Sequence, residues 1–134
     1  MHAATGRPTS EMLWFSSETP QYLAATYRIE TLKVDIQRVK VDLERTLERK
    51  ARAENNLELL DETLAYLRRS AQVVVMKEYE KIVFQRASEL GTIITDKKTI
   101  PLLESNIKIM EAELARVRGD LPSLKAKILE FKRD

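Results

Sequence analysis

The sequence predicts an all-α protein, with a long coiled-coil helix, a shorter antiparallel C-terminal helix that completes a helical hairpin, and an extended N-terminal arm. Glycine and proline, the strongest helix breakers, are absent between Pro20 and Gly91. Apolar residues recur at alternating steps of three and four along this stretch, and the pattern returns in the last third of the chain. A period close to 3.5 keeps one narrow apolar stripe turned toward a partner helix, which is typical of a left-handed coiled coil.

The composition excludes several classes of protein. The chain has 134 residues, which fits one domain, and it contains no cysteine, which excludes disulfide scaffolds, cysteine nucleophiles and thiolate metal sites. Its 23 basic and 21 acidic residues give a net charge of +2, too small an excess to indicate nucleic acid as a partner. No apolar run approaches the ~20 residues of a membrane span, so we expect no membrane partner. The expected location is the cytoplasm, or a macromolecular assembly such as a virus particle.

Residues 1–19 form the expected N-terminal anchoring arm. It contains a cluster of four large apolar residues that belongs to no heptad and is set between polar residues. Trp is common at the energetic centre of protein interfaces, and large apolar side chains can serve as short anchors in a partner's groove. The cluster can fold back on the chain's own helices or insert into a groove of another protein, and we favour the second. This partner anchor consists of Met12, Leu13, Trp14 and Phe15.

Residues 20–90 form the expected long helix. Thr19 can cap exposed N–H groups, and Pro20 at the first helical position loses only a donor that would have no partner there. A break is an open possibility near 69–75, where Ser70 precedes three valines that favour extended backbone. We call the residues that recur along this helix at steps of three and four the seam. The seam comprises Ile29, Leu32, Ile36, Val39, Leu43, Thr46, Lys50, Ala53, Leu57, Leu60, Leu64, Leu67, Ala71 and Val74.

Lys50 is a charged residue within the seam, beside Thr46 and Ala53. A polar seam residue can fix the register or the number of strands of a coiled coil at some cost in stability. Alternatively, the lysine can extend its amine outward to water at a loosely packed point. The sequence leaves both interpretations open.

Residues 91–99 form the expected connector, because their glycine, aspartate and threonine residues suit a helix end followed by a new start. Residues 100–134 form the expected C-terminal amphipathic helix, with Pro101 in its first turn and a kink near 119–122. After the chain reverses, this helix should pack antiparallel along the distal part of the long one. The expected intrachain hairpin contacts are Met76, Val83, Leu90, Ile100, Leu103, Ile107, Met110 and Leu114.

These helix lengths would leave part of the seam uncovered. At 1.5 Å per residue, residues 20–90 extend over about 105 Å and residues 100–133 over about 50 Å. Residues 20–55 would lack a partner helix, although each large apolar side chain there gains about 1.5–3 kcal/mol on burial. We therefore expect a second copy of the chain to cover them in a homo-oligomer. The expected oligomer interface consists of Ile29, Leu32, Ile36, Val39, Leu43 and Lys50.

The sequence contains no pattern typical of an active site. His2 is the one histidine, and neither a second histidine nor a cysteine exists to share a metal with it. Glu54, Glu58 and Glu62 share a helical face, but without Glu-x-x-His pairs they indicate a solvated acidic face. Phosphate-binding glycine loops and nucleophile elbows are also missing. We expect no enzymatic activity, no cofactor and no metal site.

Two functions from different classes fit this pattern. The first is a structural or assembly protein that oligomerises through a coiled coil and docks on another component of a large assembly through its arm. A virion or a tail-like machine is an example of such an assembly. The alternative is a helical-hairpin chaperone or regulatory binding module that acts on a protein client or a nucleic acid. The basic residues of the C-terminal helix would serve the alternative, but no aromatic residues lie among them for base stacking.

Overall fold

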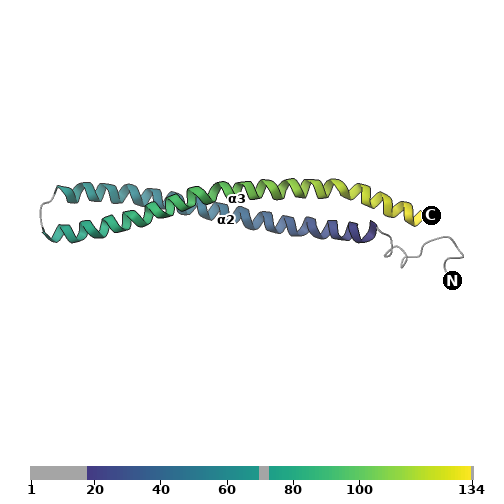
Figure 1. Cartoon of the computed structure of the whole chain (residues 1–134), viewed down its shortest axis with the longest axis horizontal. Helices are drawn as coiled ribbons and strands as arrows, with labels where there is room; N and C mark the ends of the chain where they lie inside the picture. Colours follow the sequence, from purple (N-terminus) through teal and green to yellow (C-terminus); the bar gives the residue numbers. More distant parts are fainter. Residues whose placement is uncertain (1–17, 70–72, 134) are drawn as a thin grey trace. The chain divides into compact units, whose positions relative to one another are not determined.

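The computed structural model describes residues 18–69 and 73–133, which form two helices (Figure 1). Helix α2 spans Glu18–Arg68 and has 51 residues, and helix α3 spans Val73–Arg133 and has 61 residues. The described residues contain no strand. The chain is therefore the all-α helical hairpin that the sequence predicts.

The turn between the helices lies where the sequence left a break open. Arg69 donates its backbone N–H to the carbonyl oxygen of Tyr66 at 3.1 Å, and this three-residue bond tightens the end of α2. Arg68 places a positive charge in the last turn, where the exposed carbonyl groups carry partial negative charge. Since α3 begins at Val73, one continuous helix over 20–90 does not form.

The expected connector at 91–99 is wrong, because α3 is helical throughout this stretch. A single glycine inside a helix costs only about 1 kcal/mol relative to alanine. Ile93 and Asp96 are buried at helical spacing, so a helical backbone gains packing here that an irregular connector would lose. α3 also continues through both of its prolines without a new start.

The relative lengths of the two helices are the reverse of the prediction. The C-terminal helix is the longer one, and the residues expected to pair across a chain reversal all lie along α3 itself. Leu90 and Ile100, for example, are separated by a rise of about 15 Å along one helix, so they do not face each other. The cause is the position of the turn, which transfers residues 73–99 from the first helix to the second.

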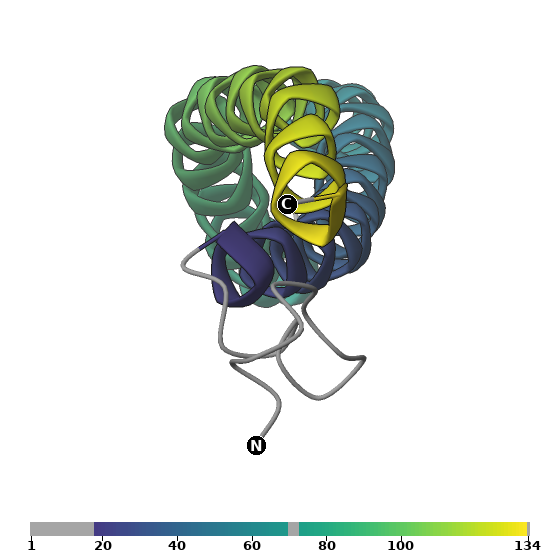
Figure 2. The same cartoon turned by 90° about the vertical axis from the view of Figure 1, so that its right-hand side faces the viewer.

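The chain divides into two compact units, and each contains a segment of both helices. The described residues of the first unit are 18–38 and 107–133, and those of the second are 39–69 and 73–106. In the first unit, the first turns of α2 lie beside the last turns of α3 (Figure 1, Figure 2).

Polar contacts fix the direction and register of the helices in the second unit. Arg49 of α2 bonds to Asp96 of α3. Two turns later on α2, Asn56 bonds to Glu89, which lies two turns earlier on α3. Equal steps in opposite directions show that the two helix segments of this unit are antiparallel.

The core of the first unit contains residues that were expected to bind a second chain. Ile29, Leu32 and Ile36 of α2 are 7%, 1% and 7% exposed. Ile107 and Val117 of α3 are buried in the same unit. The expectation that this part of the seam needs another chain is therefore wrong. With 61 residues, α3 is long enough to cover it.

The rest of the expected oligomer interface lies in the second unit and is half-buried within the single chain, so it is not a bare surface either. These residues are Val39, Leu43 and Lys50. The core of this unit contains Thr46, Ala53 and Leu64 from α2, together with Ile93 and Asp96 from α3. In both units the buried seam residues of α2 are separated by steps of three and four, or by sums of such steps.

Candidate functional site

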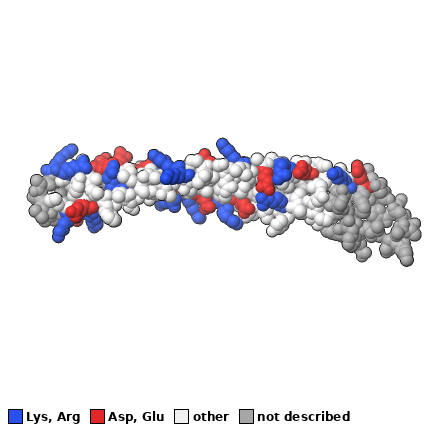
Figure 3. Space-filling model, viewed as in Figure 1, with Lys and Arg blue, Asp and Glu red and all other residues white. Residues whose placement is uncertain are grey.

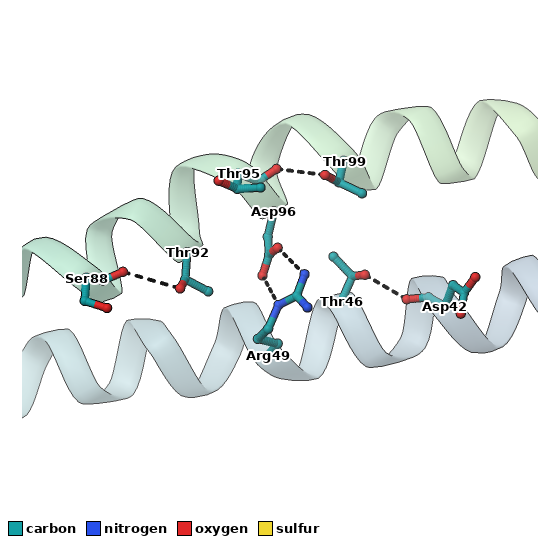
Figure 4. Close-up of polar contacts among 8 residues, drawn as sticks. All are labelled: Asp42, Thr46, Arg49, Ser88, Thr92, Thr95, Asp96 and Thr99. Atoms are coloured by element: carbon teal, nitrogen blue, oxygen red, sulfur yellow. Dashed lines mark hydrogen bonds and ion pairs between the residues drawn. The ribbon is translucent and has the colours of Figure 1, made fainter.

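Asp96 of α3 is the most deeply buried polar residue in the described part of the chain, with 1% of its surface exposed. It points toward α2, where the guanidinium of Arg49 meets it in the second unit (Figure 4). Nη2 of Arg49 donates to Oδ1 of Asp96 at 2.6 Å, and Nε donates to Oδ2 at 3.0 Å. Two parallel bonds of this kind fix the orientation of both side chains as well as their distance.

The electrostatics of this ion pair indicate a structural role. Hydrogen bonds from Arg49 hold the pKa of Asp96 below its ordinary value of 3.8, although burial raises it, and the charge of Lys50 also lowers it. Asp96 in turn raises the pKa of the Arg49 guanidinium. Both groups therefore stay ionised near neutral pH, so the pair has no proton to transfer to or from a substrate.

Threonine hydroxyls close to the ion pair are used within their own helices (Figure 4). Thr46 donates to the carbonyl oxygen of Asp42 at 2.8 Å, and Thr99 donates to that of Thr95 at 3.0 Å. No buried side-chain nitrogen or oxygen in the described residues lacks a hydrogen-bond partner. The polar side chains buried in the described interior are therefore satisfied within the chain.

Lys50 combines features of the two interpretations that the sequence left open. Its side chain is 25% exposed, which is consistent with a seam position. Its Nζ, however, lies 2.8 Å from Oε1 of Glu54 on the same helix, and this bond lowers the pKa of Glu54. The amine thus reaches along α2 toward the surface, which is the arrangement expected of a lysine that extends outward.

Sequence reasoning missed the pair formed by Arg49 and Asp96. Asp96 fell in the segment interpreted as a connector, and charged side chains are rarely fully buried unless they are paired. The signal that would have found it is the spacing of Ile93, Asp96 and Ile100, which continues steps of three and four through this segment.

Helix α3 carries a second apolar stripe in the second unit. Met76, Val83 and Ile94 in this stripe are 65%, 43% and 55% exposed. Met76 and Val83, which were expected to form intrachain hairpin contacts, are therefore not buried in the hairpin. The apolar residues Tyr79 and Ile82 are half-buried, because the helix turns their face toward α2. We call the other apolar set the outer stripe. It comprises four exposed residues, Met76, Val83, Ala87 and Ile94, and the half-buried Leu90.

The other residues predicted for intrachain contacts are at least partly buried. The half-buried residues of the second unit are Leu90, Ile100 and Leu103. In the first unit, Ile107 is buried, and Met110 and Leu114 are half-buried. The predicted partner anchor, Met12, Leu13, Trp14 and Phe15, lies outside the described residues, and so does His2.

An open groove of about 580 Å³ lies beside the outer stripe in the second unit. Two of its charged side chains are paired, since Nε of Arg86 bonds to Oδ1 of Asp61 at 2.6 Å. Nε of Arg68 donates to the uncharged hydroxyl of Tyr79 at 3.1 Å. The lining therefore mixes polar and apolar groups, as the surfaces that bind other proteins do. The apolar lining consists of Leu64, Tyr79, Val83, Ala87 and Leu90.

The described residues provide little for other kinds of site. They contain no group of three or more His, Cys, Asp or Glu that could hold a metal ion. Neither described helix is long and apolar enough to cross a membrane. On the face drawn in Figure 3, basic and acidic side chains are interspersed, with no broad area of a single sign.

Comparisons with models of protein families, with curated proteins and with solved structures find no match to this chain. The function is therefore argued from the chain's own residues, and the outer stripe with its adjoining groove is the strongest candidate site.

Proposed function

We propose that this chain is a non-catalytic structural protein of a larger assembly, which associates with itself through a coiled-coil contact and docks on another component through its N-terminal arm. A virus particle or a tail-like machine is the kind of assembly that such a protein fits. The observation that carries the proposal is the set of large apolar side chains that the hairpin leaves exposed.

Exposed apolar side chains occur in both units. In the first unit, Tyr27 and Ile109 are 73% and 64% exposed. In the second unit, Leu59 and Phe84 are 61% and 81% exposed, in addition to the outer stripe. Single exposed apolar residues are ordinary, but a stripe that recurs on one helix face favours an interaction surface.

The client-binding alternative draws support from the open groove of the second unit. A structural role is favoured over it because exposed apolar side chains also occur away from that groove, in both units. A nucleic-acid partner draws no support from the interspersed charges of Figure 3 or from the net charge of +2.

Sedimentation velocity of the full chain over a wide range of concentrations tests self-association. We expect the sedimentation coefficient to rise with concentration toward that of an oligomer. A coefficient that stays at the monomer value at every concentration would contradict this part of the proposal.

Site-specific photo-crosslinking tests the anchoring role of the arm. We expect a photoreactive phenylalanine analogue at Phe15 to crosslink to a second, distinct protein in the cells that make this chain. The same analogue at Thr9, in the polar part of the arm, is the matched control and should give much less of that product. Crosslinks from position 15 that reach only this chain's own helices would show that the arm is not an anchor for another component.

A further inference from the structure

We infer that a second copy of this chain binds the outer stripe, with α3 of one copy antiparallel to α3 of the other. This inference rests on the proposed function and names the surface through which self-association occurs. It replaces the interface that the sequence suggested, whose residues are buried or half-buried within the single chain.

The outer stripe has the geometry of a helix-pairing surface. From Met76 to Ile94 it extends about 27 Å along α3, since each residue adds 1.5 Å. Tyr79, Ile93 and Ile100 share one position of a seven-residue repeat, and this position faces α2. The outer-stripe residues occupy two other positions of the same repeat, which lie next to each other around the helix. α3 can therefore pack on α2 with one face and on a second helix with the next, as helices in four-helix bundles do.

The stripe is complementary to itself in an antiparallel arrangement. A two-fold axis between Ser88 and Glu89 places Ala87 of one copy opposite Leu90 of the other, a small residue against a large one. Such a contact is isologous, so every pairing occurs twice in the dimer. The same axis places Val83 opposite Ile94 of the second copy.

Two charged residues that flank these layers also match, and one of them, Glu80, lies between Met76 and Val83. One turn beyond these apolar layers, the two-fold axis places Glu80 of one copy opposite Lys97 of the other, and both residues are exposed. Neither forms an ion pair with another described residue. A parallel arrangement would instead set Glu80 against Glu80 and Lys97 against Lys97, so the charges favour the antiparallel pairing.

The edge of the stripe provides a further fit between the copies. Phe84 is 81% exposed, and Gly91 lies on the same edge of α3, two turns later. In the antiparallel dimer, Phe84 of one copy comes beside Gly91 of the other. A Cβ built at Gly91 meets no atom within 4 Å, so the chain itself leaves this position open for the ring.

A charge-swap experiment on the full chain tests this pairing. We expect Glu80→Lys and Lys97→Glu each to raise the dimer dissociation constant about tenfold, because each change creates two repulsive pairs in the symmetric interface. The double variant should restore the wild-type dissociation constant, since it exchanges the two charges. Lys81→Glu is the matched control: it makes the same charge change outside the stripe and should leave the dissociation constant unchanged. Sedimentation equilibrium measures the four variants and the wild type, and circular dichroism confirms that each is helical.

The outcomes separate this inference from the proposed function. Self-association that none of these substitutions alters would overturn the outer stripe as the interface and leave self-association through another surface standing. Loss of association in both single variants without rescue in the double variant would overturn the antiparallel pairing. A wild-type chain that stays monomeric would overturn both the dimer and the self-association in the proposed function.

Discussion

Asp96 is a carboxylate in a position that its helical spacing would assign to an apolar residue. Its partner Arg49 has a side chain that is 54% exposed, whereas Asp96 itself is 1% exposed. The two residues would therefore be affected differently by removal of the partner. An unpaired Arg49 can be hydrated, but an unpaired Asp96 would be a buried charge without compensation.

Substitutions at the two positions should therefore have unequal effects. We expect Arg49→Leu to lower the free energy of unfolding substantially, because it leaves the Asp96 carboxylate buried and unpaired. Asp96→Leu should stay within about 1 kcal/mol of the wild type, because it removes the buried charge and leaves Arg49, which is exposed enough to be hydrated. Urea unfolding followed by circular dichroism measures both. The reverse order would show that the carboxylate is not buried.

The same pair should make stability depend on pH in the acid range. The pKa of Asp96 is lowered in the folded chain, so the pair contributes stability above the ordinary value of 3.8, and that contribution is lost as the pH falls through the folded-state pKa. We expect the melting temperature of the wild type to fall below about pH 4. Asp96→Asn should flatten this fall, and Asp120→Asn, at an exposed position, should not. Equal acid slopes in all three proteins would contradict the assignment.

Leu32 shows how fully the single chain covers its own seam. Leu32→Ala should cost about 2–5 kcal/mol of the free energy of unfolding, because it leaves a cavity in the core of the first unit. Val34→Ala on the same helix should cost less than about 0.5 kcal/mol, since Val34 is 57% exposed. Chemical unfolding curves compare the two. Equal losses would place Leu32 outside the core.

At the scale of the element, α3 shows why single helix breakers are weak evidence. A glycine and a proline lie close together at Gly91 and Pro101, yet the helix continues through both. An interior proline costs a helix about 3 kcal/mol. Pro101 is exposed, however, so the disturbance falls on the side of the helix that faces solvent. Burial of the residues on either side offsets the cost of the glycine and the proline. Those residues face α2 together only when the backbone between them is helical.

Gly91 provides a direct test of this helix. We expect Gly91→Ala to raise the free energy of unfolding by about 0.5–1 kcal/mol, because alanine is the better helix former and a Cβ meets no atom within 4 Å. Urea unfolding at low protein concentration, where the monomer dominates, measures the effect. If residues 91–99 were a connector with a left-handed glycine, the same substitution would lower stability instead.

For the whole molecule, the position of one turn decides which surfaces remain for other chains. With the turn before Val73, α3 covers the seam residues of the first unit, such as Leu32, and the remaining exposed stripe lies on α3. With a connector at 91–99, the exposed stripe would have lain on the first helix. The self-association expected from the sequence is therefore still proposed, but on a different surface.

The sequence by itself determined the helical class and the buried seam of α2. Both follow from a local property, the recurrence of apolar residues at steps of three and four, and Ile29, Leu32 and Ile36 are buried as that periodicity requires. The missing cysteines and the near balance of charge likewise need no fold to be interpreted.

The tertiary structure alone decided where the chain turns and which face of α3 is buried. Residues 76–94 contain two stripes of helical period that include large apolar residues. The one that faces α2 also contains Arg86 and Glu89, so its local composition does not predict that it is the buried one. Packing against α2 selects between them. The register that joins Arg49 to Asp96 turns Tyr79 and Ile93 inward and leaves all of the outer stripe except Leu90 exposed. Which face is buried depends on contacts between residues far apart in the chain. The spacing of residues within one helix gives no information about those contacts.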